Sequence, residues 1–145
     1  MKDGCATTAC LELGNRIFID VDHNDVFSVG DVGIDSVDLE LVNVGADNVI
    51  GGADDVVVDT TTTSGGGYYS FDCFDPGRYY VRVASSEQAS GGTIEGLIPA
   101  SPSADLNNDV DDDNNLINSG GTYRTDALDL NFGTEPAGEY NNNPS

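Results

Sequence analysis

The sequence predicts an all-β domain, because strand signals are frequent along it and helical signals are almost absent. No stretch keeps a 3.6-residue hydrophobic period over three turns, and Gly, Asn, Asp, Ser and Thr interrupt every candidate helix. Six or seven short strands separated by turn signals are typical of an antiparallel sandwich or barrel. The length of 145 residues suits one domain with one ordinary core.

The first four expected strands lie in the first half of the chain. Residues 13–19 (LGNRIFI) end at an acidic loop, and residues 37–42 (VDLELV) alternate, with their Val and Leu side chains at every second position sharing one face. Residues 56–62 and 68–74 are separated by the segment 63–67 (TSGGG), which predicts a hairpin between them.

The second half of the chain contains two further expected strands. Pro76-Gly77 predicts a tight turn into a strand at residues 79–83 (YYVRV), and residues 123–132 form a last alternating run. Residues 44–55 and 86–121 are expected to be long irregular stretches, a length at which loops are usually functional or disordered.

These signals divide the chain into an N-terminal arm (1–10), a β-sandwich domain (11–133) and a C-terminal tail (134–145). The arm lacks the hydrophobic stretch of a signal peptide. The longest apolar runs are far too short to span a membrane.

The net charge of −21 excludes several classes of partner. Five Lys and Arg residues stand against 26 acids, of which 20 are Asp, so the chain is expected to repel nucleic acid and anionic membranes. Self-repulsion opposes folding unless cations neutralise it, through specific divalent ions or high salt. The short Asp side chain is a good ligand for hard cations and a poor helix former, which favours ion-binding loops over acidic helices.

Residues 20–31 (DVDHNDVFSVGD) have the spacing of a twelve-residue calcium loop. Side-chain oxygens occupy positions 1, 3, 5, 9 and 12, and a backbone carbonyl serves position 7. Position 6 is Asp25 instead of Gly, although Asp tolerates the left-handed conformation, and Asp at position 12 has a shorter reach than Glu. The ligands expected here are Asp20, Asp22, Asn24, the Val26 carbonyl and Asp31.

A second acidic segment at residues 105–115 alternates carboxylates and amides, and its three adjacent Asp residues would repel one another without a cation. Asp and Asn together make up 33 residues, so three of them at alternate positions arise by chance about once or twice. A solvated acidic turn for the first segment and a disordered loop for the second therefore remain alternatives. The second predicted ligand set is Asp105, Asn107, Asp109, Asp111 and Asp113.

No catalytic arrangement is selected by the sequence. His23 is the only histidine, and with 20 Asp residues nothing picks out a partner for it. A carboxylate pair for glycoside hydrolysis is always available among 26 acids and so carries no information. Phosphate loops, zinc spacings and dinucleotide fingerprints are absent, so we expect neither an enzyme nor a small-molecule substrate.

The three cysteines permit one disulfide. A Cys10–Cys73 bridge would staple the N-terminus to the sandwich, but a Cys5–Cys10 loop or three free thiols are equally open.

Three segments in order resemble the SdrD B-like domain, a relative of the Cna B-type modules of bacterial surface proteins. Residues 13–43 match its Leu-Gly start, its aromatic before an Asp, its Asx-rich loop and its Gly-Ile followed by a strand. Residues 60–83 match its Thr-rich strand, Gly-Tyr-x-Phe and Pro-Gly-x-Tyr-x-Val, and residues 128–133 (LDLNFG) its closing strand.

The resemblance implies a prealbumin-like or immunoglobulin-like antiparallel β-sandwich of about seven strands, with calcium in its acidic loops and a stalk or scaffold role at the cell surface. Three departures stand out. Phe18 replaces a Trp common in the first strand, Asp25 replaces the loop glycine, and the only lysine is Lys2, outside the predicted domain.

We therefore expect a non-enzymatic, calcium-stabilised extracellular module, a subunit or stalk of a cell-surface fibre that associates with itself or with neighbouring surface-protein domains. Residues 7–13 are the expected strand donor for such self-association. A ligand-binding adhesin, with residues 86–121 as its recognition surface, and an accessory domain of a larger secreted protein are the alternatives. Salt dependence without calcium specificity would instead indicate a halophile's protein.

Overall fold

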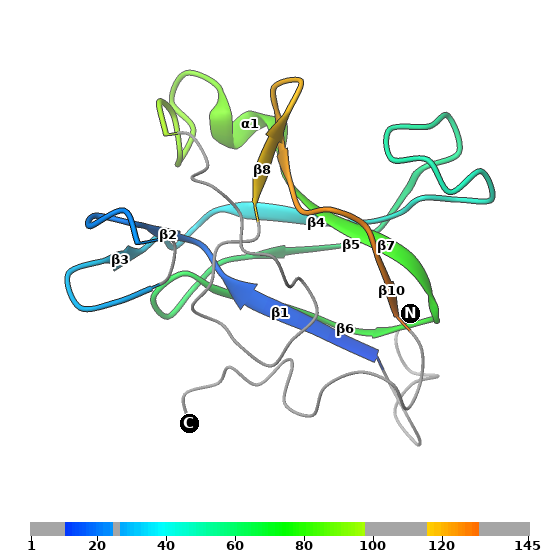
Figure 1. Ribbon diagram of the computed structural model, residues 1–145, viewed down its shortest axis with the longest axis horizontal. Coiled ribbons are helices and arrows are strands. Elements are labelled where there is room, and N and C mark those ends of the chain that lie inside the picture. Colours follow the sequence, from blue (N-terminus) through cyan, green and yellow to red (C-terminus); the bar gives the residue numbers. More distant parts are fainter. Residues whose placement is uncertain (1–10, 25–26, 98–115, 131–145) are drawn as a thin grey trace.

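The computed structural model describes residues 11–24, 27–97 and 116–130 (Figure 1). Within these residues the chain forms ten strands in antiparallel sheets and one short helix, which confirms the all-β prediction. The elements are β1 (Leu11–Arg16), β2 (Phe18–Ile19), β3 (Val32–Gly33), β4 (Asp38–Asn43), β5 (Val56–Thr62), β6 (Tyr68–Phe74), β7 (Gly77–Val83), α1 (Ser85–Gln88), β8 (Ile117–Ser119), β9 (Thr122–Arg124) and β10 (Leu128–Leu130).

The strands form a sandwich of two main layers. The larger sheet has the order β5-β4-β7-β9-β8, with β10 also pairing to β7, and the antiparallel pair β1–β6 forms the second layer. In Figure 1 the β1–β6 pair runs across the larger sheet. Side chains from both layers, such as Leu13 and Phe71 on one side and Leu39 and Val81 on the other, belong to one buried core cluster.

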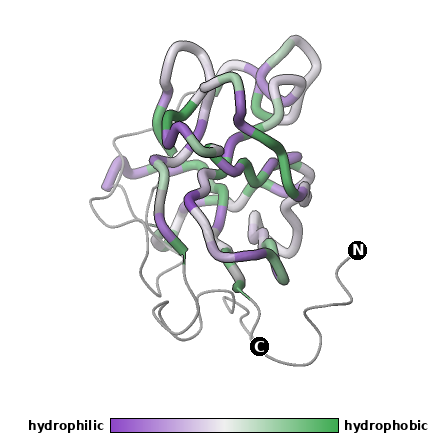
Figure 2. The backbone as a smooth tube through the Cα atoms, turned by 90° about the vertical axis from the view of Figure 1, so that its right-hand side faces the viewer, coloured by the Kyte–Doolittle hydropathy of each residue, from purple (hydrophilic) through white to green (hydrophobic). Residues whose placement is uncertain are grey.

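The alternating pattern of the fourth strand determines what it buries. Leu39 and Leu41 are fully buried in the main core, as their spacing predicts. A register shift between Leu41 and Val42 accompanies a second, smaller cluster of Val42, Val44 and Tyr80. Figure 2 shows hydrophobic stretches of the chain, in green, within the body of the domain.

Two strands have the predicted bounds, but the predicted hairpin between them is wrong. β5 pairs with β4 and β6 pairs with β1, so the two strands belong to different layers. Ser64, which lies after the end of β5, forms an isolated antiparallel bridge with Tyr68, the first residue of β6. Gly65, Gly66 and Gly67 all have positive φ angles, of 66°, 105° and 92°. Glycine adopts these angles readily, and the connection uses them to carry the chain from one layer to the other.

Other predicted strands are interrupted where the backbone bonds to a different element. The run 13–19 breaks at Ile17, whose amide donates to the Gly67 carbonyl. The run 123–132 breaks after β9, where the Thr125 amide donates to the Val81 carbonyl. Residues 44–55 contain no strand, as predicted, whereas most of α1 and all of β8 lie in the stretch 86–121 that we expected to be irregular.

Candidate metal centre

The two shortest strands form the frame of the first acidic loop. β2 and β3 pair antiparallel, with Phe18 opposite Gly33 and Ile19 opposite Val32. Asp20 follows β2 directly and Asp31 precedes β3 directly, so the pairing brings the two ends of the acidic loop together. The sequence spacing alone did not reveal this ladder, because each strand has only two residues.

The base of this frame is fixed to the turn that precedes β6. The Ile17 amide donates to the Gly67 carbonyl at 2.8 Å, and the Ile34 amide donates to the Ile17 carbonyl at 2.8 Å. Oδ1 of Asp35 accepts the amides of Gly66 and Gly67, at 2.8 and 2.7 Å. A Cβ on Gly67 would lie 2.1 Å from the Ile17 carbonyl oxygen, so this close approach requires glycine.

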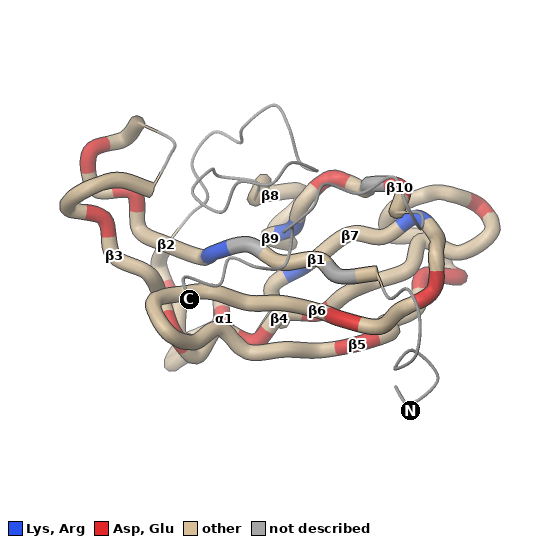
Figure 3. The backbone as a smooth tube through the Cα atoms, turned by 90° about the horizontal axis from the view of Figure 1, so that it is seen from below, with Lys and Arg blue, Asp and Glu red and all other residues tan. Residues whose placement is uncertain are grey.

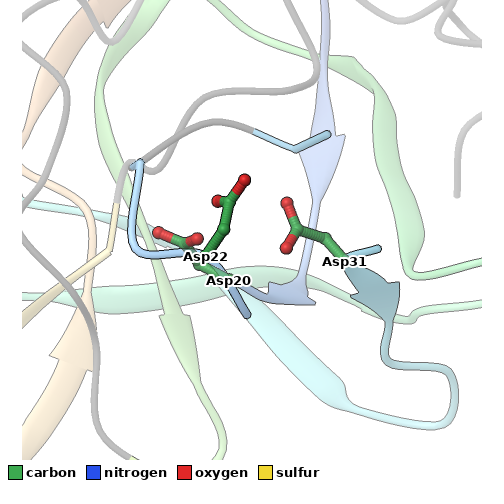
Figure 4. A group of neighbouring side chains, drawn as sticks. All are labelled: Asp20, Asp22 and Asp31. Atoms are coloured by element: carbon green, nitrogen blue, oxygen red, sulfur yellow. The ribbon is translucent and has the colours of Figure 1, made fainter. Parts of the chain in front are cut away.

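Three predicted ligands gather inside the loop. One carboxylate oxygen from each of Asp20, Asp22 and Asp31 lies within 4.8 Å of the others (Figure 4). Asp22 is exposed, and Asp20 and Asp31 are partly buried. Three carboxylates at this separation repel one another, and a cation between them would relieve that repulsion.

Asp31 ties the two halves of the loop together. Its Oδ1 accepts the Val21 amide at 2.7 Å, and its Oδ2 accepts the Ser28 amide at 2.7 Å and lies 3.2 Å from the Ser28 hydroxyl. The hydrogen bond from Val21, reinforced by those from Ser28, holds the pKa of Asp31 below its usual value, against desolvation and the repulsion of Asp20. Asp31 therefore stays ionised and available to a cation.

Asn24 and Ser28 occupy the polar positions between these carboxylates. The Asn24 amide group donates from Nδ2 to Oδ2 of Asp22 at 3.0 Å and to the Ser28 hydroxyl at 3.2 Å, while its backbone amide donates to Oδ1 of Asp20 at 3.2 Å. Coordination by Asn24 would require its side-chain amide to turn over, so that Oδ1 replaces Nδ2. The Ser28 hydroxyl also lies 3.2 Å from Oδ2 of Asp22.

Several predicted ligands fall outside the described residues. Within the described part of the first loop, His23 and Gly30 have positive φ angles, of 60° and 109°. The predicted ligands that lie outside the described residues are Val26, Asp105, Asn107, Asp109, Asp111 and Asp113.

A second group of three carboxylates, missed in the sequence, lies in the loop between β4 and β5. Asp47, Asp54 and Asp55 each offer one oxygen within 4.8 Å of the others. Oδ2 of Asp54 accepts the Ala46 amide at 2.8 Å, and Oδ2 of Asp55 accepts the Tyr80 hydroxyl at 2.8 Å. The sequence signal that could have revealed this group is the presence of acids near the start and at the end of the irregular stretch 44–55.

The two carboxylate groups lie at opposite ends of the sandwich. The β2–β3 loop and the β4–β5 loop project from the two ends of the long axis in Figure 1, and Figure 3 shows acidic residues at both ends. Both groups offer only carboxylate oxygen, without Cys or His. Oxygen-only sets suit hard cations such as calcium and magnesium and do not suit zinc or copper.

Comparisons with known proteins place this architecture in a family. A search of curated proteins finds none that matches the chain. Within the described residues, no helix is long and apolar enough to cross a membrane. A family model described as the SdrD B-like domain matches residues 11–134, which include both carboxylate groups and every described strand. SdrD B-like domains are structural modules of cell-surface proteins. The match extends over most of the chain and agrees with the sandwich described above, so this chain belongs to the SdrD B-like domain family.

Proposed function

We propose that this chain is a non-enzymatic extracellular structural module that calcium stiffens, and that it forms part of a stalk or filament at the cell surface. The observation that carries the proposal is the convergence of Asp20, Asp22 and Asp31 in a loop closed by the β2–β3 ladder. Family membership supports the structural role.

Calcium fits this loop better than magnesium does. Calcium accepts six to eight oxygen ligands at flexible geometry, whereas magnesium demands a near-ideal octahedron and releases its waters reluctantly. Three carboxylates on a partly exposed loop leave positions for an amide, a hydroxyl, a carbonyl and water. Asn24 and Ser28 lie within hydrogen-bonding distance of these carboxylates.

Association with a second copy or a neighbouring domain is supported by the edge of the larger sheet. Among the described strands β5 ends that sheet, and its Val56, Val57 and Val58 are 56, 39 and 45% exposed. An exposed apolar edge strand favours pairing with another chain. The strand donor expected from the sequence needs correction, because Leu11 and Leu13 already pair with β6 of the same chain.

The proposal predicts that calcium stabilises the wild-type protein through the first loop. Ligand that binds only the folded state adds about 2.7 kcal/mol at a hundredfold excess over its dissociation constant. For a domain of this size that corresponds to a rise in melting temperature on the order of 10 °C. The measurement is thermal unfolding in calcium and in chelator.

Two variants locate the effect. Asp20→Ala should abolish most of the calcium-dependent rise, because it removes a carboxylate of the first loop. Asp54→Asn, in the second carboxylate group, is the matched control and should retain that rise. Equal melting curves for the wild type in calcium and chelator would refute calcium stabilisation, and loss of the rise in the control alone would refute the first loop as its source.

A further inference from the structure

Arg16, at the end of β1, is held between two aromatic rings beside the first acidic loop. The Arg16 guanidinium carbon lies 3.6 Å from the centroid of the Phe27 ring and 4.2 Å from the centroid of the Tyr68 ring. Its Nε donates to the Gly66 carbonyl at 3.0 Å.

Strand pairing explains the contact between Arg16 and Tyr68. Arg16 ends β1 and lies directly opposite Tyr68, the first residue of β6, so their side chains are cross-strand neighbours. The hydrogen bond to Gly66 fixes the guanidinium over the turn that supports the β2–β3 frame. Arg16 is therefore anchored in the body of the sandwich through Tyr68 and Gly66.

The other half of the stack belongs to the acidic loop itself. Phe27 directly precedes Ser28, whose amide and hydroxyl contact Asp31. Its ring also packs edge-on against Phe18 of β2, with centroids 5.3 Å apart. Phe27 thus links the loop to Arg16 of β1 and to Phe18 of β2.

We propose that Arg16 is a positioning residue for the acidic loop: through Phe27 it holds Ser28 and Asp31 in the closed, cation-binding arrangement before a cation arrives. The inference rests on the proposed calcium function and adds to it the element that sets the affinity. A loop that is closed only part of the time binds with an affinity reduced by its closed fraction, so loss of the clamp weakens binding without removing any ligand.

Simple electrostatics predicts the opposite change in calcium affinity when Arg16 is replaced. A guanidinium beside the loop repels an incoming cation, so its removal alone would tighten calcium binding. The clamp predicts that Arg16→Met, which retains much of the apolar stem, weakens calcium binding by roughly three- to thirtyfold, the range expected for loss of cation–π contacts. The direction of the change therefore decides between the two effects.

The experiment is calcium titration of the purified full chain by calorimetry, well below its melting temperature. Arg16→Lys keeps the charge but loses the planar stacking face, and should lie between the wild type and Arg16→Met. Arg78→Met, which removes the partner of Asp129, is the charge-matched control and should retain wild-type affinity. Phe27→Leu should weaken binding as Arg16→Met does, and the double variant should be no weaker than the worse single variant, because Arg16 acts through Phe27.

A metal-free readout separates this inference from the calcium proposal. In chelator, the Ser28 amide should exchange its hydrogen roughly three- to thirtyfold faster in Arg16→Met than in the wild type, because the clamp protects the bond to Asp31. Unchanged or tighter calcium binding in Arg16→Met, with unchanged exchange, would overturn the clamp and leave the calcium proposal standing. If the wild type bound no calcium, but the Ser28 amide exchanged faster in Arg16→Met than in the wild type, the calcium proposal would be refuted and the clamp would stand.

Discussion

At the scale of single residues, Asp31 connects the acidic loop to its own backbone. Its Oδ1 accepts the Val21 amide and its Oδ2 accepts the Ser28 amide, and an amide side chain has only one oxygen to replace these two. In Asp31→Asn one of these donors would face an NH₂ group. The loop is thus held by the same carboxylate that the proposed cation would use.

Asp31 is expected to give the metal-free protein a specific pH dependence. Hydrogen bonds, that from Val21 first, lower its folded-state pKa, so the stability it contributes is present above the unfolded pKa of about 3.9 and is lost as the pH falls through the folded value. Wild type should therefore exceed Asp31→Asn in urea midpoint at pH 7 in chelator, and the gap should shrink at pH 3.

The control for this pH prediction is Asp126→Asn, which removes an exposed carboxylate outside both carboxylate groups. If the urea midpoint of the wild type exceeded that of Asp31→Asn by the same amount at pH 7 and at pH 3, the role assigned to the ionised Asp31 carboxylate would be contradicted. The variant should also bind calcium more weakly, since it lacks one of the three clustered carboxylates.

At this scale, spacing in the sequence indicated which side chains would lie close together. Asp20, Asp22 and Asn24 alternate and are followed by Asp31, the spacing of a calcium loop, and the structure brings Asp20, Asp22 and Asp31 together. Their binding of calcium stays a prediction. The contact between Arg16 and Phe27 could not be read in the same way. It depends on the register that sets Arg16 opposite Tyr68, which is fixed by the pairing of strands far apart in the sequence.

At the scale of elements, long strands were predictable and short ones were not. β5 and β6 have the predicted bounds because seven residues of β-branched and aromatic side chains make a clear pattern. β2 and β3 hold two residues each, too few for any period, although they frame the acidic loop. The hairpin prediction failed because turn residues indicate a change of direction without specifying whether the chain remains in one sheet.

The turn before β6 is expected to be the most sensitive element near the acidic loop. Gly67 combines a φ of 92° with a site where a Cβ would lie 2.1 Å from the Ile17 carbonyl oxygen, so Gly67→Ala must displace backbone. We expect it to lower the free energy of unfolding by about 3 kcal/mol or more, since it adds a steric clash to a strained backbone angle.

Gly65 in the same turn provides the matched control for this prediction. It also has a positive φ, of 66°, but a Cβ there would meet nothing within 4 Å. Gly65→Ala should cost only the left-handed strain, about 1–2 kcal/mol. Urea unfolding of both variants gives the comparison, and equal losses would show that the turn is not seated against Ile17 as described.

At the scale of the whole molecule, the two carboxylate groups are far apart. The carboxylate groups of the β2–β3 and β4–β5 loops lie at opposite ends of the long axis (Figures 1 and 3), while the core between the sheets is apolar. Modules joined end to end would therefore bring the acidic loops of neighbouring modules close together. Cations at these ends would oppose that repulsion and stiffen the ends at the same time.

Two kinds of cation effect are expected for a chain of net charge −21, and they are separable. Monovalent salt screens exposed charges over a Debye length of about 8 Å at 0.15 M and about 3 Å at 1 M, so it should raise the melting temperature of the chelated protein gradually. A calcium site built from clustered carboxylates responds instead to a single ion at low concentration, and a large excess of sodium weakens it without replacing it.

We therefore expect millimolar calcium to raise the melting temperature further in 1 M sodium chloride, and expect the same concentration of magnesium to raise it less. The reason is geometric, because oxygens from a flexible, partly exposed loop satisfy the irregular shell of calcium more easily than the octahedron of magnesium. The measurement is a melting series over sodium chloride concentration, each point taken with chelator, calcium and magnesium. Asp20→Ala should reproduce the sodium dependence of the wild type while losing the calcium increment. If 1 M sodium chloride alone restored full stability and calcium added nothing, general screening of the −21 charge would account for the acidic loops, and the protein would be adapted to high salt.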